Sequence, residues 1–341
     1  MSTLVHPGRS GTDEIRCPAR SCSRSVVKVD VLDDLLYGTR ARGGVFNLTI
    51  LDPPWGLDIC DEAPLALATL LHGSGWVMRD GHDPVWMGER DVAVLAGGDS
   101  YVVADTPDTR PTLRIHPGGE CERLPGAPVD YSARLGVRTH GGRKDGAVWV
   151  VSGTYAMAGE VGRRLLSALP ETLVVPAAEV GSVMDLALNE IQRDQLGQQS
   201  VLDRWLDLAL ITTLRAWFDR DETRAPGWYR AQSDPVVGTA LQLIHDDPAH
   251  PWTVASLADA TGVSRASLSR KFTGIVGESP ISYLTGWRLT LAADLLYDTT
   301  DTVDAIARRV GYANAFAMSV AFKRVRGTTP SAHRNSLAST T

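Results

Sequence analysis

The chain has 341 residues, of which 43% are hydrophobic and 22% are charged, and its formal net charge is −6. This composition is ordinary for a soluble globular protein, and the length is enough for two domains. No run approaches the ~18 uninterrupted apolar residues that a membrane span needs, and the polar N-terminal segment lacks the apolar core of a secretory signal. With only four cysteines, we expect no disulfide framework and a cytoplasmic location.

The charge is divided unevenly along the chain. Residues 235–341 contain 10 basic and 8 acidic residues, which gives +2, whereas residues 1–234 contain 24 basic and 32 acidic residues, which gives −8. The basic residues of the C-terminal part lie mostly in and beside two similar stretches. Such clustering is typical of a surface that binds nucleic acid.

Residues 1–24 have little apolar periodicity and are predicted to form a flexible tail. Residues 25–178 then contain short β-type runs, such as "VFNLTIL", "LALATLL" and "AVWVVSG", separated by turn-rich clusters such as "DPPWG" and "HPGGE". Many short strands with this punctuation predict an antiparallel β-barrel or sandwich.

Residues 179–232 change to helical periodicity and are predicted to form a connector. Apolar side chains recur there at three- and four-residue steps, in two sets that are broken near "DQLGQQS". The second helix, "VLDRWLDLALITTLRAWF" at 201–218, has an apolar stripe. This stripe can pair with its copy or pack on the β-domain, and we expect a homodimer. The last domain, residues 233–335, is predicted to be all helical.

The stretch "TVASLADATGVSRASLSRKF", residues 253–272, predicts a helix-turn-helix. Thr253 can cap a helix over 254–260, Gly262 permits the tight turn, and Ser264 can cap the next helix. Leu268 and Phe272 then face inward, because they lie four residues apart on one helix face. The outer face is polar and basic: Arg265, Ala266, Ser269, Arg270 and Lys271.

The stretch "TVDAIARRVGYANAFAMSVAF", residues 302–322, repeats this pattern. Thr302 and Asn314 take the capping positions, Gly311 the turn, and Met318 and Phe322 the inward positions. The offset between the copies is 49 residues up to the glycine and 50 residues after it, so the second turn has one extra residue.

Between the copies, "SPISYLTGWRLTLAADLLYDT" predicts a long helix that holds both units. Two recognition helices on one rigid frame can enter successive major grooves about 34 Å apart. The alternative is that each copy is only an αα-hairpin of a helical bundle. Two in-phase copies with basic helix ends favour the first interpretation.

Residues 236–334 resemble the AraC/XylS family of bacterial transcription regulators, most closely in "IARRVGYANAFAMSVAFKRVRGTTPSAHR". Two N-terminal stretches, "MGERDVAVLAGGDSYVVAD" and "VSGTYAMAGEVGRRLLSALP", resemble more loosely the core and the closing segment of a cupin sensor domain. The resemblance implies a two-domain β + α protein. Its parts are an N-terminal cupin-like antiparallel β-barrel, a helical connector and a C-terminal all-α domain with two helix-turn-helix motifs.

The resemblance also implies which residues face DNA. In the first recognition helix the family's base-facing positions match Ala266, Ser269 and Arg270, and Arg270 can pair with guanine for about 1–3 kcal/mol of discrimination. In the second they match Ala315, Phe316, Ala317 and Val320, which are all apolar, unlike the polar face of many relatives. We expect contacts to thymine methyls there, with Lys323, Arg324 and Arg326 near phosphates. The full predicted DNA-binding set is Arg265, Ala266, Ser269, Arg270, Lys271, Ala315, Phe316, Ser319, Val320, Lys323 and Arg324.

A cupin can hold a catalytic metal through histidines and a carboxylate. Here the eight histidines are scattered without a His-x-His pair. Tyr101 stands after "GGDS", where metal-binding cupins carry His. We therefore expect no metal and no enzyme, with a metal-binding cupin as an alternative. A barrel of this size can hold one small molecule, and the candidate pocket residues are Trp55, Trp76, Trp86 and Tyr101.

The four cysteines leave three interpretations open. Cys17 and Cys22 lie close together in an arginine-bearing tail that favours thiolate, while Cys60 and Cys121 lie in the β-region. They can be inert thiols, a redox switch of an oxidant-sensing regulator, or zinc ligands together. Ser152 stands where the family's closing segment often carries Cys before Gly, which weakens a direct transfer of a redox role.

The sequence therefore predicts a regulator of transcription with a double-stranded DNA operator and a small-molecule effector as its partners. The family more often activates, which adds RNA polymerase as a partner. Apart from the zinc alternative, no cofactor is expected.

Overall fold

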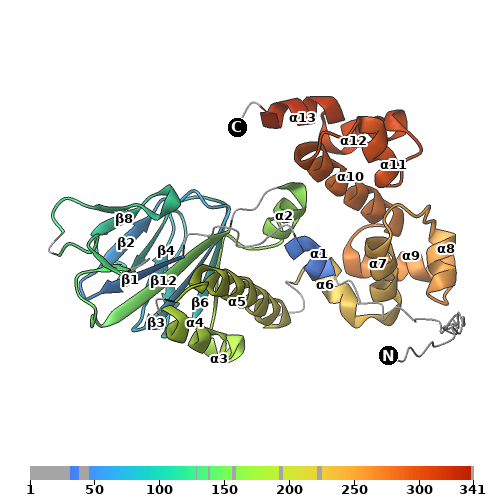
Figure 1. Cartoon of the computed structure of the whole chain (residues 1–341). Coiled ribbons are helices and arrows are strands. Elements are labelled where there is room, and N and C mark those ends of the chain that lie inside the picture. The colour runs from blue at the N-terminus through green and yellow to red at the C-terminus, as the bar shows by residue number, and fades with distance from the viewer. Residues whose placement is uncertain are drawn as a thin grey trace, which may run out of the picture.

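The computed structural model describes residues 31–37, 46–127, 129–136, 139–155, 159–191, 195–220 and 225–338 (Figure 1). The predicted tail at 1–24, with Cys17 and Cys22, lies outside the described residues. A β-rich N-terminal unit occupies the left of Figure 1, and an all-helical unit occupies the right. None of the described helices combines the length and the hydropathy that crossing a bilayer requires.

The β-rich unit contains two sheets. The seven-stranded sheet has the order β10-β11-β1-β12-β3-β6-β13, and the six-stranded sheet has the order β5-β4-β7-β2-β8-β9. The strands are β1 (Phe46–Leu51), β2 (Gly56–Ile59), β3 (Leu65–His72), β4 (Gly75–Met78), β5 (Val85–Met87), β6 (Val92–Ala96), β7 (Tyr101–Ala104), β8 (Leu113–Ile115), β9 (Cys121–Arg123), β10 (Arg134–Gly136), β11 (Thr139–Gly141), β12 (Val148–Tyr155) and β13 (Thr172–Val175).

Strand alternation divides the apolar residues of this unit between two cores. On β3, Ala66, Ala68 and Leu70 belong to the core between the sheets, whereas Leu65, Leu67 and Leu71 belong to the core under the helices. Both faces of β3 are therefore buried, so it reads as a continuous apolar run. Most pairs are antiparallel, as predicted, while β1 with β11 and β2 with β8 are parallel. The cupin-like, β-rich prediction is confirmed.

Three helices pack on the outer face of the seven-stranded sheet: α3 (Ala177–Val180), α4 (Val183–Ile191) and α5 (Gln198–Arg220) (Figure 1). Gly153 of β12 lies directly under Leu206 of α5, where a Cβ atom would come within 2.4 Å of the Leu206 side chain. The Tyr155 hydroxyl donates to the Leu206 carbonyl at 2.6 Å. The predicted helix 201–218 thus packs its inner face on the sheet.

The C-terminal unit is helical throughout the described residues, as predicted. Its elements are α6 (Gly227–Arg230), α7 (Pro235–Asp246), α8 (Val254–Ala260), α9 (Arg265–Val276), α10 (Pro280–Asp298), α11 (Val303–Arg309), α12 (Ala315–Arg326) and α13 (Pro330–Ala338). α10 crosses the whole unit and contacts α9, α11, α12 and α13 (Figure 1). Its buried residues contribute to the cores of both helix-turn-helix motifs.

Two short helices, α1 (Val31–Tyr37) and α2 (Gly159–Leu166), lie between the units (Figure 1). α1 contacts α2, α6 and α7, and α2 packs along α10. Residues 31–37 form a helix because Val31, Leu32, Leu35 and Leu36 supply a helical apolar face that is buried against its neighbours.

Candidate nucleic-acid interface

The first helix-turn-helix consists of α8 and α9, and its predicted caps are present. The Thr253 side chain accepts from the Ser256 amide and the Ser256 hydroxyl accepts from the Thr253 amide, which makes a reciprocal capping box. The Ser264 side chain accepts from the Ser267 amide at the start of α9. Gly262 has φ +70°, a conformation in which side-chain-bearing residues are strained. The turn is therefore fixed by local chemistry.

The outer face of α9 is open to solvent. Leu268 and Phe272 are fully buried, whereas Arg265, Ala266 and Arg270 are exposed and Ser269 is half-buried. Lys271 is exposed and lies 3.4 Å from the Asp234 carboxylate. Among the residues that the structure describes, no carboxylate lies within 4 Å of Arg265 or Arg270. Their guanidinium groups thus remain available to a ligand.

The second helix-turn-helix consists of α11 and α12. The Thr302 side chain caps α11 through the Ala305 amide, and the Asn314 side chain caps α12 through the Ala317 amide. Asp304 also accepts from the Ala315 amide at 3.1 Å, which ties the start of α12 to α11. Gly311 has φ +90° and is packed against Ala249 and Arg288.

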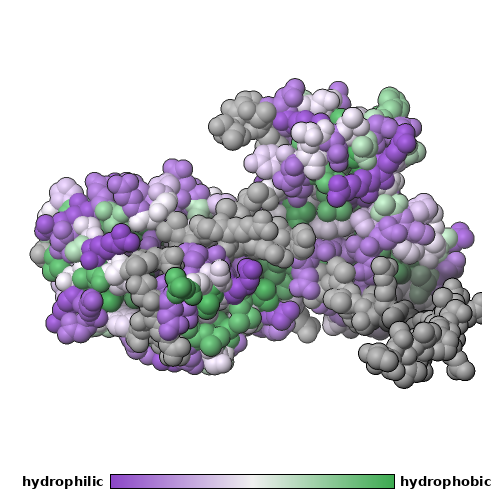
Figure 2. Space-filling view, in the orientation of Figure 1, coloured by the Kyte–Doolittle hydropathy of each residue, from purple (hydrophilic) through white to green (hydrophobic). Residues whose placement is uncertain are grey.

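The outer face of α12 differs chemically from that of α9. Phe316 is 78% exposed and Val320 is 55% exposed, while Met318 and Phe322 are fully buried. Ala315 and Ser319 are half-buried beside them. Apolar side chains gather in this upper right region of Figure 2, amid polar ones. Lys323 and Arg324 are exposed at the C-terminal end of the helix.

The N-terminus of α2, a helix of the cupin unit, docks onto α10. The Asp294 carboxylate of α10 accepts hydrogen bonds from the Glu160 and Val161 amides, the second at 3.2 Å. Gly159 has φ +90°, and a Cβ there would come within 2.6 Å of the Asp294 carboxylate. Only glycine therefore allows this approach. Burial raises the pKa of Asp294, and the two amide donors oppose that effect.

Two further side chains join α2 to the helical unit. Glu160 pairs with Arg326, the last residue of α12, at 2.9 Å, and both side chains are less than one-fifth exposed, at 17% and 18%. The Arg164 guanidinium lies 4.7 Å from the centre of the Tyr283 ring of α10. Arg326, which the sequence analysis placed near phosphates, is thus bound inside the protein in this conformation.

A buried polar chain joins α1 to the same region. His245 of α7 is fully buried, its Nδ1 contacts the Asp34 carboxylate of α1, and its Nε2 lies 2.8 Å from the Tyr283 hydroxyl. Burial raises the pKa of Tyr283 to about 12. Sequence reasoning missed these contacts between the units. The one sequence feature that could have indicated such a contact is Asp294, a lone acid within the apolar run "LTLAADLL" of α10.

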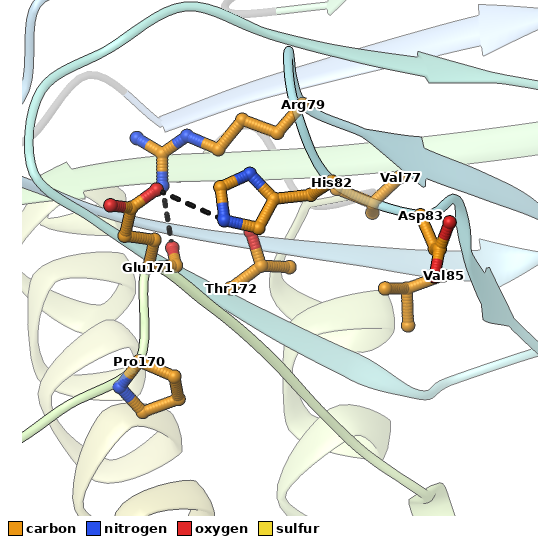
Figure 3. A pocket seen from close by; sticks show the side chains of 8 residues that line it. All are labelled: Val77, Arg79, His82, Asp83, Val85, Pro170, Glu171 and Thr172. Atoms are coloured by element: carbon orange, nitrogen blue, oxygen red, sulfur yellow. Dashed lines mark hydrogen bonds and ion pairs between the residues drawn. The ribbon is translucent and has the colours of Figure 1, made fainter.

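The aromatic pocket candidates fall in two places. Trp55 is fully buried and Tyr101 is 4% exposed, both within the core between the sheets. Trp76 and Trp86 form an edge-to-face pair on the outer side of the six-stranded sheet, with ring centres 5.3 Å apart. None of the four lines the cavity of about 200 Å³ at the edge of the β-rich unit, whose lining side chains are shown in Figure 3.

Cys60 and Cys121 lie on opposite sides of β8. The Cys60 amide donates to the Ile115 carbonyl, and Cys121 pairs with Ile115 on the other side. Because neighbouring strands are about 4.8 Å apart, their Cα atoms are separated by roughly twice that distance, beyond the ~7 Å limit for a disulfide. Burial raises the pKa of both thiols. Within the described residues, no three His, Cys, Asp or Glu side chains cluster as metal ligands.

Comparison with known proteins identifies both units. A family model described as cupin matches residues 30–219, and one described as helix-turn-helix domain matches residues 257–336. An AraC-like transcription regulator from Streptomyces lividans is 30% identical over 312 residues, which cover 90% of this chain and 98% of the relative. One from Streptomyces antibioticus is 32% identical over 317 residues, with the same coverage.

Among solved structures, the DNA-binding domain of the transcription factor AdpA, in complex with a target DNA, is 27% identical, with a TM-score of 0.30. It covers 31% of this chain and 96% of that domain. The cupin match spans more than half of the 341 residues, and the two Streptomyces relatives match over nearly their whole length. The chain therefore belongs to the AraC-like transcription regulators, with an N-terminal cupin domain and a C-terminal helix-turn-helix domain that binds DNA.

Proposed function

We propose that this protein is a sequence-specific, non-enzymatic regulator that places α9 and α12 in successive major grooves of an operator. The observation that carries the proposal is the pair of capped recognition helices, each with its outer face exposed, held on the single helix α10. One rigid frame fixes the spacing of the two helices, so both motifs read the same face of the duplex.

The two helices have different tasks in this proposal. α9 offers Arg265 and Arg270, which have no carboxylate within 4 Å among the described residues, so it can form bidentate contacts to guanine. α12 offers Phe316 and Val320, which suit thymine methyls, and Lys323 and Arg324, which suit phosphates. Sequence choice then depends mainly on the first motif.

The cupin domain senses a small molecule and acts on the DNA-reading unit through α2. The contacts that support this are the Asp294 hydrogen bonds and the Glu160–Arg326 ion pair, which join α2 to the linker helix and to the end of α12. A shift of α2 would release Arg326 and alter how the two motifs are held. In line with the family, we favour activation, in the cytoplasm and together with RNA polymerase.

A second copy of the chain is the proposed occupant of the outer surface of α4 and α5. Leu186, Val201 and Leu208 are 58%, 48% and 42% exposed there, and the last two lie seven residues apart on one face of α5. Figure 2 shows apolar side chains gathered over this part of the molecule, at the lower right of the β-rich unit. Symmetric dimers are the commonest soluble assemblies, and a dimer would join two DNA-reading units.

The experiment for the proposal is selection of bound duplexes from a random pool by the full-length protein. We expect one enriched motif with two blocks of specified bases, one helical turn apart, and a stronger preference in the block that α9 reads. Enrichment of no motif at physiological salt would overturn sequence-specific regulation, because non-specific phosphate contacts alone select nothing.

A further inference from the structure

The loop that leads into the first helix-turn-helix rests directly on the turn of the second. This loop, residues 247–252, joins α7 to α8, and the Trp252 indole donates to the Asp247 carbonyl across it at 2.9 Å. A Cβ atom on Gly311 would lie only 2.8 Å from the Cα atom and from the carbonyl oxygen of Ala249. The two motifs therefore meet backbone to backbone, in addition to their shared packing on α10.

Arg288 of α10 lies at this contact and touches both sides of it. Its Nε donates to the Pro248 carbonyl at 2.6 Å, and its Nη2 donates to the His250 carbonyl at 2.7 Å. On the other side, its guanidinium carbon would lie 2.8 Å from a Cβ atom on Gly311, and it lies 5.9 Å from the centre of the Tyr312 ring. One side chain thus joins the loop of the first motif to the turn of the second.

Position 288 is also the place where α10 passes from one core to the other. Trp287 belongs to the core that contains the first motif, whereas Leu289 belongs to the separate core of the second. The partly buried Leu291 packs against both cores. Because apolar contact between the cores is thin here, the orientation of one motif relative to the other depends on further contacts.

The chemistry of arginine suits such a contact. The guanidinium is a planar fork whose donors have fixed directions, so two carbonyls two residues apart hold it in one orientation. Partial burial lowers the pKa of Arg288, yet an arginine stays protonated at neutral pH, and its hydrogen bonds are therefore charge-assisted. A residue with a single donor would hold the loop less firmly.

We infer that Arg288 is a positioning residue that fixes the orientation of the two motifs relative to each other, and with it the number of base pairs between the blocks that α9 and α12 read. The inference rests on the proposed function, because it concerns two helices on one duplex. Arg288 acts through the loop that ends at the Thr253 cap of α8 and through the turn that precedes α12. One added base pair shifts a block by about 3.4 Å and rotates it by about 34°, so rigidly held motifs discriminate against it.

The test measures the affinity of the full-length protein for a selected operator and for versions with one base pair added or removed between the two blocks. Arg288→Met keeps the apolar stem and removes the donors. Arg334→Met is the matched control, because Arg334 is also half-buried and also donates to two backbone carbonyls. Those carbonyls belong to Leu296, near the end of α10, and to Asp301, in the loop before α11.

A second pair of variants tests the contact from the side of the turn. Gly311→Ala adds a Cβ atom that crowds the backbone of Ala249 and pushes the turn away from the loop. Gly262→Ala is its control, because Gly262 takes the same turn position in the first motif with φ +70°, but a Cβ atom there meets no atom within 4 Å. Both substitutions strain a left-handed backbone, so a difference between them reports the crowding alone.

We expect the native chain and both controls to lose affinity by about tenfold or more when the spacing changes by one base pair. In Arg288→Met and Gly311→Ala this loss should fall to about threefold or less. A variant that is merely less stable has a smaller folded fraction, which lowers its affinity for every spacing equally and leaves the ratio between spacings unchanged.

Three results would count against the inference. Discrimination between spacings in Arg288→Met that equals that of the native chain overturns it and leaves the proposed function intact, and so does equal relaxation in Arg334→Met. If Arg288→Met does not fold, the second pair decides, and equal discrimination in Gly311→Ala and Gly262→Ala then refutes the inference. A native chain that accepts every spacing equally refutes the placement of both helices in successive grooves, and the inference with it.

Discussion

At the residue scale, the exposed arginines of α9 carry the proposed sequence choice. Arg270 has the reach and the planar donor geometry for guanine, and no described carboxylate competes for it within 4 Å. The pattern of inward Leu268 and Phe272 was sufficient to predict which side of α9 faces outward, and the structure confirms it. The role of Arg270 itself stays a prediction.

Arg270→Ala should weaken specific binding by about 1–3 kcal/mol and relax selection at one base pair. Arg134→Ala is a suitable control, because Arg134 is an exposed arginine of the cupin domain. Competition binding with operator and mismatched duplexes measures the effect. An unchanged preference at every position of the operator would show that Arg270 touches no base.

The cysteine thiols supply a second prediction at this scale. Because burial raises the pKa of Cys60 and Cys121, little thiolate is present at pH 7, and their alkylation should be slow and still accelerate above pH 9. Mass spectrometry after timed iodoacetamide treatment of the native chain gives both rates. Rapid alkylation at pH 7 would revive a redox role for these two residues.

At the scale of the element, α2 is the part that sequence reasoning could not place. The helix is short, and nothing in its own pattern shows that its first amides meet Asp294, which lies more than 130 residues later in the chain. The caps of α8, α9, α11 and α12 were predictable, because each depends on residues three positions apart. The helix-turn-helix motifs could therefore be predicted from neighbouring residues, whereas the contact between the two units depends on residues far apart in the chain.

Asp294→Ala should remove the cap of α2 and cost about 1 kcal/mol of docking stability. The amides of residues 160 and 161 should then exchange faster with deuterium. Asp298→Ala changes an exposed acid one turn further along α10 and serves as the control. Equal exchange in the two variants would mean that Asp294 does not hold α2 in place.

The surface of α4 and α5 yields a prediction on assembly. Leu208→Glu places a charge in the proposed contact between copies and should shift the protein from dimer to monomer at micromolar concentration. Light scattering after size-exclusion chromatography measures the molar mass of the protein in solution. Val129→Glu is the control, since Val129 is 40% exposed but lies outside this surface. A monomeric native chain, or a dimer that tolerates Leu208→Glu, refutes this interface.

At the scale of the whole molecule, one continuous core runs from the cupin unit through α1 and α2 into the first helix-turn-helix. The second motif has a separate core, with Met318 and Phe322 at its centre. The fold class was predictable because strand alternation and helical periodicity change clearly near residue 179. How the two units contact each other was not predictable, because the segment 31–37 is too short to indicate which helices it packs on.

Methylation protection of a selected operator by the full-length protein reports contacts to guanine N7 in the major groove, and it therefore tests where α9 and α12 lie on DNA. We expect two protected patches on one face of the duplex, about 10 base pairs apart, with Arg270→Ala losing protection only in the patch that α9 reads. A single protected patch, or two patches on opposite faces, would contradict the placement of both helices in successive major grooves.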